Sequence, residues 1–142
     1  MTTVLIAPPE PEYPTGGFLF NAGIAKELSG NDSFHYRHYG IDHRPGPDLF
    51  GDFGRCTVVL DSLFLETPTF HDGLVNSGHS VGYLVHSLHS QIRSGATSAP
   101  TELERHALSR ADFAIVPSRF MERHLNSWFP DLPTAVVAPG SQ

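Results

Sequence analysis

The feature that most constrains this chain is a series of short apolar runs separated by segments with helical periodicity. Runs that are apolar along their whole length, rather than alternating, suit strands of a parallel sheet buried on both faces. The alternation of strand and helix predicts an α/β domain of Rossmann-like type, with three layers and a doubly wound, mainly parallel sheet of about six strands. The predicted strands are residues 3–7 (TVLIA), 34–39 (FHYRHY), 56–60 (CTVVL), 81–85 (VGYLV), 113–116 (FAIV) and 135–137 (AVV).

Several of the segments between these runs carry helix start signals. Thr67 followed by Pro68 predicts an N-cap with proline at the first helical position. Thr101 and Glu104 have the spacing of a capping box, and Ser118 is placed to cap the last helix. A further helix is predicted after the first strand, with an apolar face formed by Phe18, Ala22, Ala25 and Leu28.

Length and charge bound the class of protein. We treat residues 1–142 as one domain, because a chain of 142 residues has room for a single substantial core. The net charge is −6 and the basic residues are scattered, which argues against a nucleic-acid partner. Cys56 is the only cysteine, so no disulfide forms within the chain and a buried apolar role is expected. We expect a cytoplasmic protein, and no basic amphipathic helix supports membrane association.

The loop after the first strand is the first candidate for ligand binding. Ligands of parallel α/β sheets bind at the carboxyl ends of the strands, and here a proline-rich loop leads to Gly16 and Gly17 before a helix begins. Paired glycines let the backbone approach a ligand closely, and first-turn amides attract anions. Gly16 and Gly17 are therefore candidates for binding a phosphate or sugar phosphate. The alternative is a tight turn without a ligand, and neither common nucleotide-binding fingerprint is present.

The ends of the third and fourth strands carry further polar candidates. Asp61 and Ser62 follow the third strand, where the carboxylate either binds a substrate hydroxyl or caps the next loop. His86 and Ser87 follow the fourth. A histidine in that position can donate a hydrogen bond to a sugar or phosphate or exchange a proton near neutral pH. The alternative is a half-buried histidine bonded to a backbone carbonyl.

Two other patterns indicate a catalytic or metal site less strongly. The stretch GHSVG matches G-x-S-x-G around Ser80, but it precedes a predicted strand, whereas a hydrolase nucleophile follows one. The histidine pairs His35/His38 and His86/His89 lack a carboxylate at motif spacing, so no metal is expected.

Four stretches together resemble the N-terminal half of a GT-B fold glycosyltransferase, most closely the large group called family 4. The first is the opening strand with its glycine pair and helix, and the second is the strand that ends in a histidine. The third is an acidic, arginine-rich helix leading to a strand and a serine, and the fourth is the final strand with Pro-Gly. In order, these stretches are VLIAPPEPEYPTGGFLFNAGIAKEL, VGYLVHSLHS, TELERHALSRADFAIVPSRFMERHL and AVVAPGSQ.

The resemblance implies a hexosyltransferase-type enzyme that moves a sugar from a nucleotide-diphosphate sugar to an acceptor hydroxyl. It implies that Gly16 and Gly17 face the donor phosphates and that His86 is the catalytic residue, which reaches the transferred sugar or the acceptor. Asp61, Ser62 and Ser87 are candidate acceptor contacts by position alone. The nucleotide sugar is a co-substrate, and the resemblance implies no metal or other cofactor.

Relatives of this kind bind the donor through a second domain, which is not among these 142 residues. We therefore expect the isolated chain to be inactive, and the partner domain to be supplied in cis or as a separate subunit. A fragment of a longer enzyme, a natural half-enzyme and a domain that has lost catalysis are all consistent with this. The alternatives are a non-catalytic Rossmann-like assembly subunit and, less well supported, an α/β hydrolase.

Overall fold

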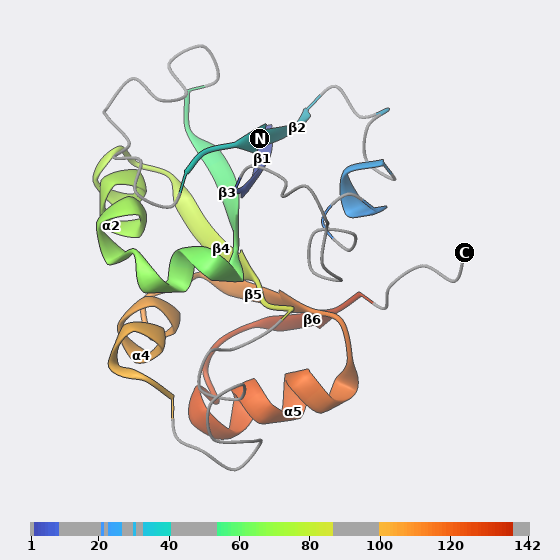
Figure 1. The fold of residues 1–142 in the computed structure, drawn as a ribbon, viewed down its shortest axis with the longest axis vertical. Coiled ribbons are helices and arrows are strands. Elements are labelled where there is room, and N and C mark those ends of the chain that lie inside the picture. The colour runs from blue at the N-terminus through green and yellow to red at the C-terminus, as the bar shows by residue number, and fades with distance from the viewer. Residues whose placement is uncertain are drawn as a thin grey trace.

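The computed structural model describes residues 2–8, 21, 23–26, 30, 33–40, 54–86 and 100–137. In this part of the chain, six parallel strands form one sheet in the order β2-β1-β3-β4-β5-β6 (Figure 1). The predicted Rossmann-like α/β fold and all six strands are confirmed, and the strand ends differ from the predicted ones by at most one residue. The strands are β1 (Thr2–Ala7), β2 (Phe34–His38), β3 (Cys56–Asp61), β4 (Ser80–Leu84), β5 (Phe113–Val116) and β6 (Thr134–Val136).

The strand order places a topological switch point between β1 and β3. β2 is added on one side of β1, whereas β3 to β6 follow one another on the other side. Connections that leave β1 and β3 therefore diverge at the carboxyl ends of these strands, which is where open parallel sheets bind ligands. A ligand-binding site is therefore expected at the carboxyl end of β3 and the neighbouring carboxyl end of β4.

Helices cover both faces of the sheet. The larger core lies on the face that carries α2 (Pro68–Asn76), α4 (Glu102–Leu108), α5 (Arg119–Trp128) and the 3₁₀ helix η1 (Ser62–Glu66). On the opposite face, Ile24 from the helical residues after β1 packs with Leu5, Val59 and Leu84. Figure 1 shows that helical segment, in blue, on the other side of the sheet from α2 and α4. Among the residues described, no helix combines the length and the hydropathy that a membrane span requires.

The helix starts follow local sequence. The capping box is confirmed: Thr101 Oγ1 accepts from Glu104 N at 3.1 Å and Thr101 N donates to Glu104 Oε1 at 2.9 Å. Ser118 Oγ likewise caps α5, through Met121 N at 3.2 Å. The α2 helix begins at Pro68 as predicted, but Thr67 makes no side-chain cap bond. Its hydroxyl donates instead to the carbonyl of Phe64, at 3.1 Å, in the preceding 3₁₀ turn.

One glycine in the sheet is required by packing. A Cβ atom on Gly82 in β4 would lie 2.3 Å from the ring of Phe113 in the neighbouring strand β5. The ring therefore lies directly over the β4 backbone, and only a residue without a side chain leaves room for it. This contact helps to hold β5 beside β4.

Candidate functional site

Asp61 is the centre of a group of bonded polar side chains at the carboxyl end of β3. It is the last residue of β3, and its side chain is 1% exposed. Its Oδ1 accepts a hydrogen bond from Leu63 N at 2.8 Å, so that it caps η1. The capping interpretation of Asp61 is therefore confirmed for one of its two oxygens, which leaves the other oxygen for side-chain partners.

His86 is brought to Asp61 by the parallel pairing of β3 with β4. Asp61 is in register with Leu84, and His86 lies two residues beyond it. His86 Nε2 lies 3.0 Å from Asp61 Oδ2, and its side chain is 14% exposed. The two strand-end residues that sequence reasoning singled out are thus bonded to each other. A carboxylate bonded to an imidazole that solvent can still reach is an arrangement suited to proton transfer.

Ser62 completes an arrangement that superficially looks like a catalytic triad. Its Oγ lies 3.5 Å from His86 Nδ1, at the outer limit of a hydrogen bond. Ser62 is only 6% exposed, so a substrate carbonyl has poor access to its hydroxyl. The amide of Leu63, one possible oxyanion donor beside it, already donates to Asp61. The geometry therefore suits His86 to proton exchange with a bound ligand better than to activation of Ser62.

Asn21 is a member of this group that sequence reasoning missed. Its Nδ2 donates to Asp61 Oδ2 at 2.5 Å, the same oxygen that His86 contacts, and the residue is fully buried. A sequence signal existed, since Asn21 is a polar residue three positions after Phe18 and four before Ala25, on the predicted apolar face of that helix. A polar residue in such a stripe marks either a packing fault or a buried polar partner.

Three of the predicted ligand contacts fall outside the part of the chain that the structure describes. Gly16, Gly17 and Ser87 lie outside the described residues. The phosphate-binding role of the two glycines and the acceptor-binding role of Ser87 therefore stay predictions.

The alternative hydrolase nucleophile lies at the wrong edge of the sheet. Ser80 is the first residue of β4 and is exposed, so it lies at the amino end of the strand whose carboxyl end leads to His86. The prediction that the GHSVG stretch has the wrong context is confirmed.

Across the described ranges, no three His, Cys, Asp or Glu side chains are grouped closely enough to hold a metal ion.

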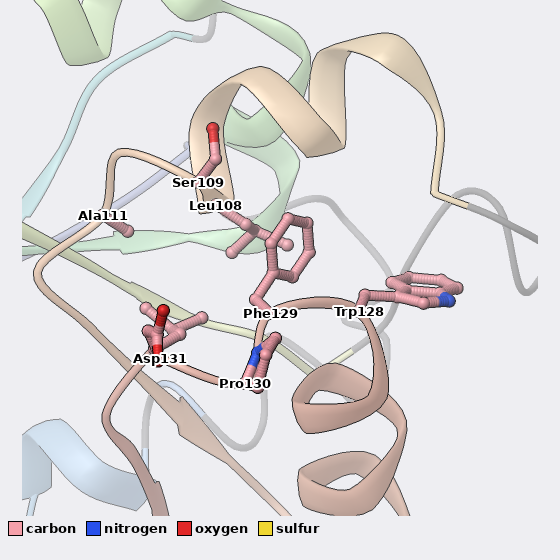
Figure 2. Close-up of a pocket in the computed structure, with 8 residues that line it drawn as sticks. Leu108, Ser109, Ala111, Trp128, Phe129, Pro130 and Asp131 are labelled. Carbon is pink, nitrogen blue, oxygen red and sulfur yellow. The ribbon is translucent and has the colours of Figure 1, made fainter.

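A surface pocket is also found at the amino-end edge. Figure 2 shows it between the connection that leads from α4 into β5 and the one that leads from α5 into β6. Among the described residues that line it, Asp131 alone is titratable, so they do not supply the paired groups that acid–base chemistry needs. The residues that line it are Leu108, Ser109, Ala111, Trp128, Phe129, Pro130, Asp131 and Leu132.

Comparison of the chain with protein-family models, with curated proteins and with solved structures finds no match. The functional interpretation therefore depends on the geometry of Asn21, Asp61, Ser62 and His86.

Proposed function

We propose that this chain is the acceptor-side domain of a glycosyltransferase that moves a sugar from a nucleotide-diphosphate donor to an acceptor hydroxyl. The observation that carries the proposal is the contact between Asp61 Oδ2 and His86 Nε2, 3.0 Å apart, at the carboxyl ends of two neighbouring strands. This pair lies beside the switch point of a parallel sheet, which is the place where such folds bind substrates. The sequence resemblance supplies the class of reaction.

In this proposal His86 acts as the general base and Asp61 holds it in place. A carboxylate only accepts hydrogen bonds, so His86 presents a protonated Nε2 to Asp61 and an unprotonated Nδ1 on its other side. Nδ1 takes the proton of the acceptor hydroxyl as the acceptor oxygen bonds to the anomeric carbon of the donor sugar. The bond from that carbon to the diphosphate oxygen breaks, and the diphosphate leaves with the electron pair.

The departing diphosphate gains negative charge and needs stabilisation. We assign that role to the amides around Gly16 and Gly17, because amides that open a helix stabilise anions. A second domain, in cis or as a separate subunit, is proposed to hold the nucleotide. Asp61 and Ser62 are proposed to lie next to the acceptor. Because both side chains are almost fully buried, they act through His86 rather than by bonding to the acceptor directly.

Ligand binding to the 142-residue chain tests the proposal. The probes are UDP-glucose, GDP-mannose and a set of methyl hexopyranosides at millimolar concentration, and the readout is saturation-transfer difference NMR. We expect at least one sugar to receive saturation from the wild-type chain. We expect the His86→Ala and Asp61→Asn variants to lose that response while their amide spectra stay folded.

A matched control separates a specific site from a general effect of losing a histidine. His106 lies exposed on α4 and contacts Arg110, so His106→Ala removes an imidazole far from Asp61. This variant should bind as the wild type does. Absence of binding by every probe, or binding that survives both His86→Ala and Asp61→Asn, would overturn the proposal. Hydrolysis of a simple ester that Ser80→Ala abolishes would favour the hydrolase instead.

A further inference from the structure

Asn21 is bonded to the candidate site by the most buried contact in it. Its Nδ2 donates to Asp61 Oδ2 at 2.5 Å, and His86 Nε2 contacts the same oxygen at 3.0 Å. The third donor, Leu63 N, bonds to Oδ1 at 2.8 Å. Both oxygens of the carboxylate therefore accept a bond besides the one from the imidazole, and among the described residues His86 is its partner that solvent can partly reach.

The chemistry of the partners fixes the orientation of the Asn21 amide. An ionised carboxylate has no proton to donate, so the amide must present its nitrogen to Asp61 and turn its oxygen away. That oxygen, Oδ1, is buried and has no hydrogen-bond partner in the structure of the described residues. Leaving a buried carbonyl unpaired is unfavourable, as is asparagine within a helix. The bond from the amide nitrogen to Asp61 offsets these two unfavourable features.

We propose that Asn21 is a positioning residue: its amide fixes Asp61 so that His86 keeps its proton on Nε2 and uses Nδ1 as the proton-accepting nitrogen. This inference rests on the proposed function, since it adds a residue that positions the proposed general base of the same site. Asn21 acts through Asp61. The bond from Asn21 keeps Oδ2 in a single place, so the imidazole cannot follow a moving carboxylate away from the substrate.

The first measurement needs no ligand. In the ¹⁵N-labelled chain at neutral pH, long-range ¹H–¹⁵N correlation shows which ring nitrogen of each histidine carries the proton. We expect His86 to carry it on Nε2, with that proton protected from solvent exchange. His79 is an internal reference, because its Nδ1 accepts from Cys56 N at 3.0 Å, which places its proton on Nε2 as well. A proton on Nδ1 of neutral His86 would overturn the inference.

The second measurement tests Asn21 itself. Asn21→Leu keeps the shape of the side chain and removes both the bond to Asp61 and the unpaired carbonyl. We expect exchange of the His86 Nε2 proton to become roughly tenfold faster or more, the size expected for loss of a bond to a charged group. The His79 signal should stay as in the wild type, and the melting temperature should change by no more than about 4 °C.

A matched control and a double variant complete the test. Asn126 lies exposed on α5 and accepts from Thr134 Oγ1 near the amino end of β6, so Asn126→Leu should leave His86 exchange unchanged. If Asn21 acts through Asp61, adding Asn21→Leu to Asp61→Asn should change exchange little further. Wild-type exchange in Asn21→Leu, or additive effects in the double variant, would contradict the inference. Neither result depends on whether a sugar binds, so this inference and the proposed function can fail separately.

Discussion

The two edges of the sheet use polar side chains for different purposes. At the amino-end edge, side chains satisfy backbone amides: His79 Nδ1 accepts from Cys56 N at 3.0 Å, and Asp112 Oδ2 accepts from Val81 N at 2.9 Å. Burial, and to a lesser extent the charge of Arg55, lowers the pKa of His79, so the imidazole stays neutral and can accept. These groups anchor strand ends, and such a role requires no ligand.

At the carboxyl ends of β3 and β4, side chains bond mainly to one another. Asn21 and His86 both bond to one oxygen of Asp61, and only the second oxygen serves the backbone. One carbonyl in this group is left buried without a partner in the described structure. From this contrast we infer that a histidine or an aspartate at a strand end is structural when all its partners are backbone groups. It is a candidate for chemistry when its partner is another titratable side chain.

Replacing Asp61 should have the largest effect. Asp61→Ala leaves three buried or half-buried donors without their acceptor, and we expect a loss of about 4 kcal/mol in the free energy of unfolding. Urea unfolding followed by circular dichroism measures it, with the exposed Asp131→Ala as a control that should unfold like the wild type. Loss of sugar binding should accompany it, and unchanged unfolding would mean that Asp61 is not the centre of the group.

Acid should destabilise the fold through a buried histidine that belongs to neither edge. His71 Nδ1 lies 2.8 Å from the Tyr83 hydroxyl, and its Nε2 has no partner among the described residues. Burial first, and then the charge of Arg110, lowers the pKa of His71 from 6.5 to about 4. The folded state therefore binds this proton less readily than the unfolded state, and protonation favours unfolding.

The sign of this effect fixes the pH window. Above pH ~6.5 the group is neutral in both states and has no effect. As the pH falls from about 6.5 to about 4, stability should drop by about 3 kcal/mol and then level off. The His71→Gln variant keeps a hydrogen-bonding partner for Tyr83 but does not titrate, so its urea midpoint should depend less on pH. An equally steep dependence in this variant would assign acid unfolding to other groups.

Replacing Asp112 should have the smallest effect on the free energy of unfolding. It also tests whether the amino-end edge of the sheet is independent of the candidate site at the carboxyl-end edge. Asp112 is exposed and directly precedes β5, and Asp112→Ala removes the acceptor for Val81 N in β4. We expect a loss of about 1 kcal/mol in the free energy of unfolding. Sugar binding should be unchanged, because the residue lies at the amino-end edge. The same urea and NMR measurements apply, and a lost ligand response would show that the two edges are coupled.

The sequence indicated Asp61 and His86 as candidate site residues, because both follow buried strands and the carboxyl ends of parallel strands share one edge of the sheet. It could not show that the two would bond, since that depends on β3 lying next to β4. It missed Asn21 because a polar residue in an apolar helical stripe shows no partner until the helix is placed against the sheet. It also predicted that Thr67 caps α2 with its side chain. In the structure, the Thr67 hydroxyl donates to the carbonyl of Phe64 in the preceding 3₁₀ helix instead.

The strands, the starts of α4 and α5 and the parallel α/β class could all be predicted from local sequence, because apolar runs and capping side chains act over a few neighbouring residues. The tertiary structure alone decided the strand order, and through it which side chains meet. Asn21 and Asp61 are 40 positions apart in the chain, and Asp61 and His86 are 25 apart. Contacts over such separations exist only once the sheet has assembled, so the candidate site is a property of the fold.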